Sequence, residues 1–237
     1  MAKMLLYMSK TGCGKSTSLH SLDPKTTFII KPNSKPLPFP KGGQYSAANQ
    51  NQLQTADLAD LNPTIAAIST SAPHIKTVVI EDFTHFFSAR IFSAKFRSRN
   101  QGGEAFARWN DFAGDVYASF IKDHEKWRED LTIVVLHHTE TKDDGSTGFK
   151  TSGKLLDNSI QIPGYFTYIL HGIVREDAEG RPQYGVVTNK TQGLEAKTPS
   201  GMFPLIIPND MQYILDTINN YTAPENIENF KPNYITQ

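Results

Sequence analysis

The sequence predicts an α/β fold in which a mainly parallel β-sheet carries helices on both faces. Four short apolar segments, at 3–8, 26–30, 77–80 and 131–136, are separated by longer segments, and the last three are rich in β-branched residues. Strands that alternate with helices are typical of parallel sheets, because each connection must cross one face of the sheet. Three of these strands run directly into polar residues, and such sheets bind their ligands beyond the carboxyl ends of the strands.

The composition fits one large domain with a short tail. The chain has 237 residues, of which 38% are hydrophobic and 20% charged, and we expect a domain over 1–221 and a polar, flexible tail over 222–237. The 24 Lys and Arg residues equal the 24 Asp and Glu residues, so a nucleic-acid partner requires a local basic patch.

The sequence also predicts a cytoplasmic protein with no membrane partner. No apolar run approaches the roughly 18 to 20 residues of a membrane-spanning helix. The apolar stretch in residues 1–8 is too short for a signal peptide and leads directly into a glycine-rich motif. A single cysteine, Cys13, agrees with a reducing compartment.

In the first half of the chain, the strand at 3–8 precedes the glycine-rich motif and a helix that continues over 17–21. After the strand at 26–30, prolines and glycines forbid regular structure over 31–43. A helix is expected at 55–70, broken at Asn62-Pro63.

In the second half, apolar residues spaced by three or four predict a long helix over 104–127. The strand at 131–136 leads into a polar loop at 139–153. Further strands are expected at 165–174 and 184–188, joined by a turn at 177–180, followed by a helix at 210–221.

The glycine-rich motif fits the P-loop pattern, which is Gly, four residues, then Gly-Lys-Ser/Thr between a strand and a helix. Its first glycine is replaced by Ser9. Backbone amides around Gly12 and Gly14 would close on phosphate oxygens. Lys15 would bridge the β- and γ-phosphates, and the Ser16 hydroxyl would bind Mg²⁺. We therefore expect ATP and Mg²⁺ as cofactors, bound by Ser9, Lys10, Thr11, Gly12, Cys13, Gly14, Lys15, Ser16 and Thr17.

Two acids, Glu81 and Asp82, follow the strand at 77–80. Phosphoryl transfer needs a carboxylate for the metal and a group that positions the attacking water. One acid would therefore join Ser16 in holding Mg²⁺ and the other would orient water, and the sequence leaves the assignment open.

Two histidines, His137 and His138, follow the strand at 131–136. We expect His137 to sense the γ-phosphate, which makes the predicted catalytic set Lys15, Glu81, Asp82 and His137. A zinc site is disfavoured, because neither a nearby cysteine nor a helical histidine pair supports one.

The order of motifs resembles that of the phage-encoded RecA-like P-loop ATPases of the Sak group, which are single-strand annealing or recombination proteins. The resemblance covers residues 3 to about 222, and its departures are Ser9 in place of glycine and Glu81 where many relatives carry aspartate. The most specific segment reads Ala-Lys-Thr-Pro-Ser-Gly-Met-Phe, at 196–203. The other matching segments are 10–17, 78–83, 136–140, 151–157 and 207–210.

The resemblance implies a RecA-like core that acts on single-stranded DNA as a homo-oligomer, with the nucleotide near a subunit interface. A single-strand-binding protein is a further expected partner, and the location would be the host cytoplasm. Lys150 and Lys154 are the candidates for a cation acting on a neighbouring subunit's site or for DNA contact. The basic stretch at 90–99, with Arg97 and Arg99, is the best electrostatic patch for DNA, besides the loop at 139–153.

Two other functions remain open at this stage. A nucleotide-gated binding module with little turnover would share the P-loop. A P-loop kinase would share it too, although the arginines cluster over 90–108 and form no clear lid for a phosphate acceptor.

Overall fold

The computed structural model describes residues 1–143, 145–191 and 193–223, and most of the predicted tail lies outside them. Among the described residues, nine strands form one sheet in the order β3-β2-β4-β5-β1-β7-β8-β9, with β6 paired to β5. The strands are β1 (Lys3–Ser9), β2 (Thr27–Lys31), β3 (Gln52–Gln54), β4 (Thr77–Ile80), β5 (Thr132–Thr141), β6 (Thr147–Phe149), β7 (Tyr168–Glu176), β8 (Pro182–Val187) and β9 (Ile206–Pro208).

The sheet is parallel from β3 to β7, and β8 and β9 continue it as antiparallel strands. Strand β5 lies between β1 and β4, so the strand of the glycine-rich motif and the strand that precedes the two acids are not neighbours. The carboxyl ends of β2, β4, β5 and β1 therefore form one continuous edge, and residues that follow these strands can meet there.

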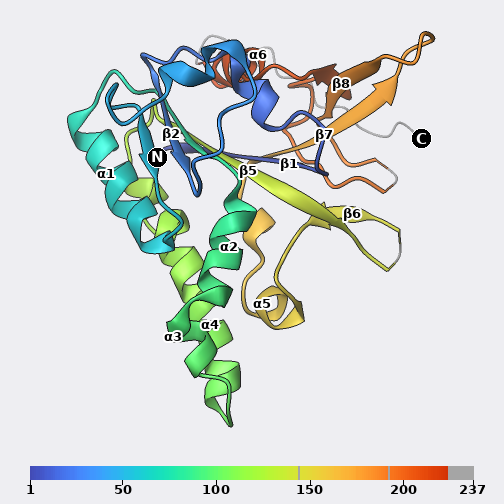
Figure 1. The fold of residues 1–237 in the computed structure, drawn as a ribbon. Coiled ribbons are helices and arrows are strands. Elements are labelled where there is room, and N and C mark those ends of the chain that lie inside the picture. Colours follow the sequence, from blue (N-terminus) through green and yellow to red (C-terminus); the bar gives the residue numbers. More distant parts are fainter. Residues whose placement is uncertain (144, 192, 224–237) are drawn as a thin grey trace.

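Helices cover both faces of the sheet (Figure 1). Alternate residues of β1 point to opposite faces, so Met4, Leu6 and Met8 join one apolar cluster while Leu5 and Tyr7 join the other. The first cluster includes residues of α1 (Leu61–Ser71), α2 (Phe83–Phe92), α3 (Ala94–Ser98), α4 (Glu104–Val116) and α5 (Lys154–Ser159), and the second includes residues of α6 (Met211–Tyr221). The α/β class predicted from the sequence is confirmed.

Several predicted elements change at their ends. Pro63 does not break a helix but lies in the first turn of α1, where its missing N–H costs no hydrogen bond. The helix predicted over 104–127 is regular only to Val116 and continues as a π-helical turn over Tyr117–Ile121. The helix after the glycine-rich motif is a short 3₁₀ helix, Ser16–Ser21.

Strand β5 is longer than the sequence predicted. It runs to Thr141, so His137 and His138 lie within it, and β6 returns beside it as an antiparallel strand. The expected loop at 139–153 is therefore largely a β-hairpin. Polar residues hid this extension, because the strand leaves the apolar core before it ends.

Candidate functional site

The glycine-rich loop follows β1, and its geometry explains why serine replaces the first glycine. Gly12 and Gly14 have φ values of 84° and 80°, which favour glycine. Ser9 is the last residue of β1 and has no positive φ, so a side chain is tolerated there. A Cβ atom on Gly14 would lie 2.5 Å from Nδ2 of Asn209, and that amide donates to the Gly14 carbonyl at 2.9 Å.

The Lys15 ammonium is buried inside this loop, with 8% of the residue exposed. It donates to the carbonyl and hydroxyl oxygens of Ser9 at 3.0 and 3.2 Å and to the Lys10 carbonyl at 3.2 Å. Burial lowers the pKa of Lys15 to about 8, although Asp82 and Glu81 act to raise it. The oxygens that accept from the Lys15 ammonium are all neutral. A phosphate oxygen that took their place would form a stronger bond, because it carries negative charge.

The two acids Glu81 and Asp82 contact different partners in the structure. The Ser16 hydroxyl donates to Glu81 Oε1 at 2.6 Å. Burial raises the pKa of the Glu81 carboxyl, and the Ser16 hydrogen bond opposes that effect. Two hard oxygen donors beside a phosphate loop fit Mg²⁺, which takes few protein ligands and completes its shell with water and phosphate. Ser16 and Glu81 would hold the ion, and bound Mg²⁺ would neutralise charge on the phosphate oxygens.

Asp82 lies with histidines instead. Its Oδ2 is 2.7 Å from Nδ1 of His85, and its Oδ1 is 3.4 Å from Nε2 of His138. That buried Oδ1 has no hydrogen-bond partner among the described residues. Burial acts to raise the pKa of Asp82, but His138 and His85 hold it below its usual value. The backbone of Asp82 is left-handed at φ 54°, which aspartate tolerates better than most residues.

The position predicted to sense phosphate needs a correction, because His138 and not His137 faces the loop. His138 Nδ1 lies 3.3 Å from Lys15 Nζ and 3.5 Å from Thr11 Oγ1. His137 is fully buried on the other face of β5, where its ring stacks on Phe149 at 3.7 Å. Neighbouring strand residues point to opposite faces, so only one of the two histidines can reach the site.

His137 has a structural arrangement of its own. Its Nε2 donates to the Lys150 carbonyl at 2.6 Å, and its Nδ1 lies 3.3 Å from Thr84 Oγ1. Burial lowers the pKa of His137 to about 3, so the ring is neutral at physiological pH. Through these contacts it ties the end of β6 to the start of α2.

One pocket of about 240 Å³ lies at the carboxyl ends of the strands, and it is lined by Lys15, Ser16, Glu81, Asp82 and His138. Of the other predicted loop residues, Lys10, Thr11 and Thr17 are exposed and Cys13 is half-buried. Residues that sequence reasoning missed also line the pocket, namely Asn33, Lys35, Pro36, Leu37, Pro38 and Tyr184. The proline-rich segment at the end of β2 was a usable signal, whereas nothing local marked Tyr184.

The cations predicted to act in trans or on DNA lie outside this pocket. Arg97 lies in α3 and Arg99 directly follows it. This helix projects from the sheet together with the start of α4 (Figure 1). Arg99 pairs with Glu104 and Asp111, so its charge is neutralised within the projection. Lys150 is exposed just after β6, and Lys154 begins α5.

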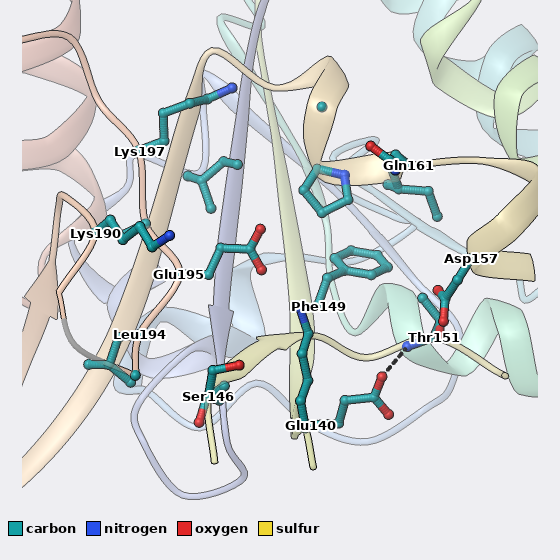
Figure 2. A pocket seen from close by; sticks show the side chains of 18 of the residues that line it. Glu140, Ser146, Phe149, Thr151, Asp157, Gln161, Lys190, Leu194, Glu195 and Lys197 are labelled. Atoms are coloured by element: carbon teal, nitrogen blue, oxygen red, sulfur yellow. Dashed lines mark hydrogen bonds between the residues drawn. The ribbon is translucent and has the colours of Figure 1, made fainter. Parts of the chain in front are cut away.

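A larger cavity of about 1160 Å³ lies beside the β5–β6 hairpin. Figure 2 shows Lys190, Glu195 and Lys197 on one side of it and Glu140 and Thr151 on the other. The Thr151 amide is 3.4 Å from Glu140 Oε1. The lining thus combines charged groups of both signs with apolar side chains such as Phe149 and Leu194.

The strand order, with β5 between β4 and β1 and the glycine-rich loop after β1, fits a RecA-like α/β fold. No protein-family model matches the chain, and no curated protein matches it. Among solved structures, a KaiC-like protein from the hyperthermophilic archaeon Pyrococcus horikoshii OT3 is similar at 11% identity and a TM-score of 0.41, over 83% of this chain and 81% of that chain. In the part of the chain that the structure describes, no helix is long and apolar enough to cross a membrane.

Proposed function

We propose that the protein is an ATPase that hydrolyses MgATP at the phosphate pocket. The observation that carries this proposal is the meeting of Lys15, the Ser16–Glu81 pair and Asp82 around one small pocket. Phosphoryl transfer depends on positioning and charge stabilisation, and this set supplies a cation, a metal site and a carboxylate.

In this mechanism each group has one task. Lys15 would bind the β- and γ-phosphate oxygens, and Ser16 with Glu81 would hold Mg²⁺, which would offset negative charge on the phosphates. Asp82 lines the pocket beside His138, and its carboxylate is suited to accept a hydrogen bond from the attacking water. His138, next to both Lys15 and Asp82, replaces His137 as the candidate γ-phosphate sensor. Tyr184, exposed beside Gly14, offers a ring on which the base can stack.

We further propose that this ATPase acts on single-stranded DNA in recombination, as the resemblance to the Sak group implies. The larger cavity offers Lys142, Lys190 and Lys197 for phosphate contacts, although Glu140, Asp157 and Glu195 line it too. The exposed ring of Tyr165 lies close by, since a shallower pocket contains both Tyr165 and Lys197. Lysines along a groove and an exposed aromatic ring are the groups that bind single strands without sequence preference. Assembly as a homo-oligomer, and binding of a single-strand-binding protein, remain predictions of the same resemblance.

The test measures ATP hydrolysis with and without single-stranded DNA, for the wild type and for Lys15→Ala. We expect hydrolysis that rises with DNA and falls by at least about 10²-fold in the variant. Hydrolysis indifferent to DNA would contradict the DNA proposal alone. Nucleotide binding without hydrolysis would favour a gated binding module.

A further inference from the structure

The segment at 33–39 follows β2 and forms one wall of the phosphate pocket. Of the strands whose ends meet at this pocket on that side of β1, β2 is the farthest from β1. Between the two walls lie Glu81, Asp82 and His138, which follow or belong to β4 and β5. A phosphate chain that begins at the glycine-rich loop and reaches the metal site therefore points its last phosphate toward this wall.

The segment is held in place at both ends. Lys31, the last residue of β2, is buried, and its ammonium donates to the Lys35 carbonyl. The Lys35 amide donates to Asn33 Oδ1 at 3.0 Å. Phe39 packs into the core against Tyr45 with ring centroids 6.3 Å apart. The prolines at 36 and 38 remove further backbone freedom, so the segment is ordered before any ligand arrives.

Close packing fixes the middle of the segment as well. A Cβ atom on Gly42 would lie 2.8 Å from the Leu37 carbonyl oxygen, so only glycine allows this approach. The Lys35 side chain stands out from this fixed backbone: it is exposed and lines the pocket.

The charge of the pocket requires a second cation. Its ionic lining consists of Lys15 and Lys35 against Glu81 and Asp82. ATP beside two carboxylates carries more negative charge than Mg²⁺ and Lys15 together would offset, and a second cation near the γ-phosphate would reduce that excess.

We propose that Lys35 is a catalytic cation supplied by the chain itself, which binds the γ-phosphate of ATP from the wall opposite the glycine-rich loop. This inference rests on the proposed nucleotide site and adds a residue that tells ATP from ADP. Lys31 is not available for the same task, because its ammonium is buried and bound to the Lys35 carbonyl.

The experiment compares binding of a non-hydrolysable MgATP analogue and of MgADP by titration calorimetry. In Lys35→Ala we expect analogue affinity to fall at least about tenfold with ADP affinity unchanged, because one charge-assisted bond to the γ-phosphate is lost. Hydrolysis should fall by about 10²-fold. Lys35→Arg should retain most of both, and Lys41→Ala is the matched control, since Lys41 is an exposed lysine nearby that does not line the pocket.

The outcomes separate this inference from the proposed function. If the wild type binds both nucleotides, Lys15→Ala weakens both, and Lys35→Ala binds them as the wild type does, the role of Lys35 is wrong while the nucleotide site stands. An equal loss for the analogue and ADP also overturns it. If the wild type binds neither nucleotide, the proposed function itself fails.

Discussion

In the phosphate pocket, the Lys15 ammonium is buried and donates to neutral backbone and hydroxyl oxygens, and one buried oxygen of Asp82 has no hydrogen-bond partner among the described residues. In the projection formed by α3 and the start of α4, the charge of Arg99 is instead paired at the surface, with Glu104 and Asp111. Charged groups that are buried yet incompletely paired mark a place for a ligand, whereas charges that satisfy one another mark structure.

Among substitutions in the two regions, Asp82→Asn is expected to have the largest effect, which is on turnover. The amide keeps the shape and tolerates the left-handed backbone, but it loses the carboxylate that would accept a hydrogen bond from the attacking water. We expect kcat to fall by about 10²- to 10³-fold with little change in nucleotide affinity. Steady-state kinetics check this, with Glu81→Gln as the matched variant.

The Glu81→Gln control should behave differently. It removes the carboxylate bonded to Ser16, so the dependence of nucleotide affinity on Mg²⁺ should weaken. If both variants change affinity and turnover in the same way, the separation of roles between the two acids is incorrect.

A second, smaller effect is the pH dependence of stability that arises from His137. Its buried ring has hydrogen-bond partners for both nitrogens in the neutral form. Its pKa is lowered to about 3 in the folded protein, against about 6.5 unfolded. Between these values the unfolded chain binds the extra proton, so stability falls as pH drops through this window and is fully present above it. This group alone should contribute a slope of up to about 1.4 kcal/mol per pH unit.

Denaturant unfolding between pH 4 and 7 would measure that slope. His137→Gln should be less stable at pH 7, because the stack on Phe149 is lost, and should show a shallower dependence on pH. An unchanged slope would mean that another group dominates acid unfolding.

The smallest effect is expected in the projection. Arg99→Ala should change the free energy of unfolding only slightly, because its partners are more than half exposed, at 62% for Glu104 and 54% for Asp111. ATP hydrolysis should be unchanged. A strong loss of DNA binding in this variant would restore the basic stretch as a DNA contact, and a filter-binding or anisotropy assay would reveal it.

The parts of the fold that follow from local pattern were predictable. The apolar strands at 3–8, 77–80 and 131–136 and the helix capped by Asp210 carry their own periodicity and capping signals. The glycine-rich loop and both acids were found because their chemistry needs particular residue types at fixed spacing.

The remaining features depend on which strands become neighbours. The order β4-β5-β1 decides that His138 meets Lys15, and a shift of one residue would have given His137 that place. Tyr184 and Asn209 reach Gly14 from more than 150 residues away, so no local pattern marks them. The pairing of Arg99 likewise arises from the fold of α3 against α4, which removes one cation from the apparent basic patch.

The left-handed backbone at Asp82 has a consequence for how this site can change through evolution. Exchange of the two acids would place glutamate at φ 54°, a conformation that aspartate and asparagine adopt several-fold more readily than other side chains. It would also put a shorter side chain at position 81, where the 2.6 Å bond from Ser16 depends on the reach of glutamate. Each single step of the exchange thus passes through a site with either two glutamates or two aspartates. The order Glu-Asp therefore suits this backbone and the Ser16 contact better than the reverse order would.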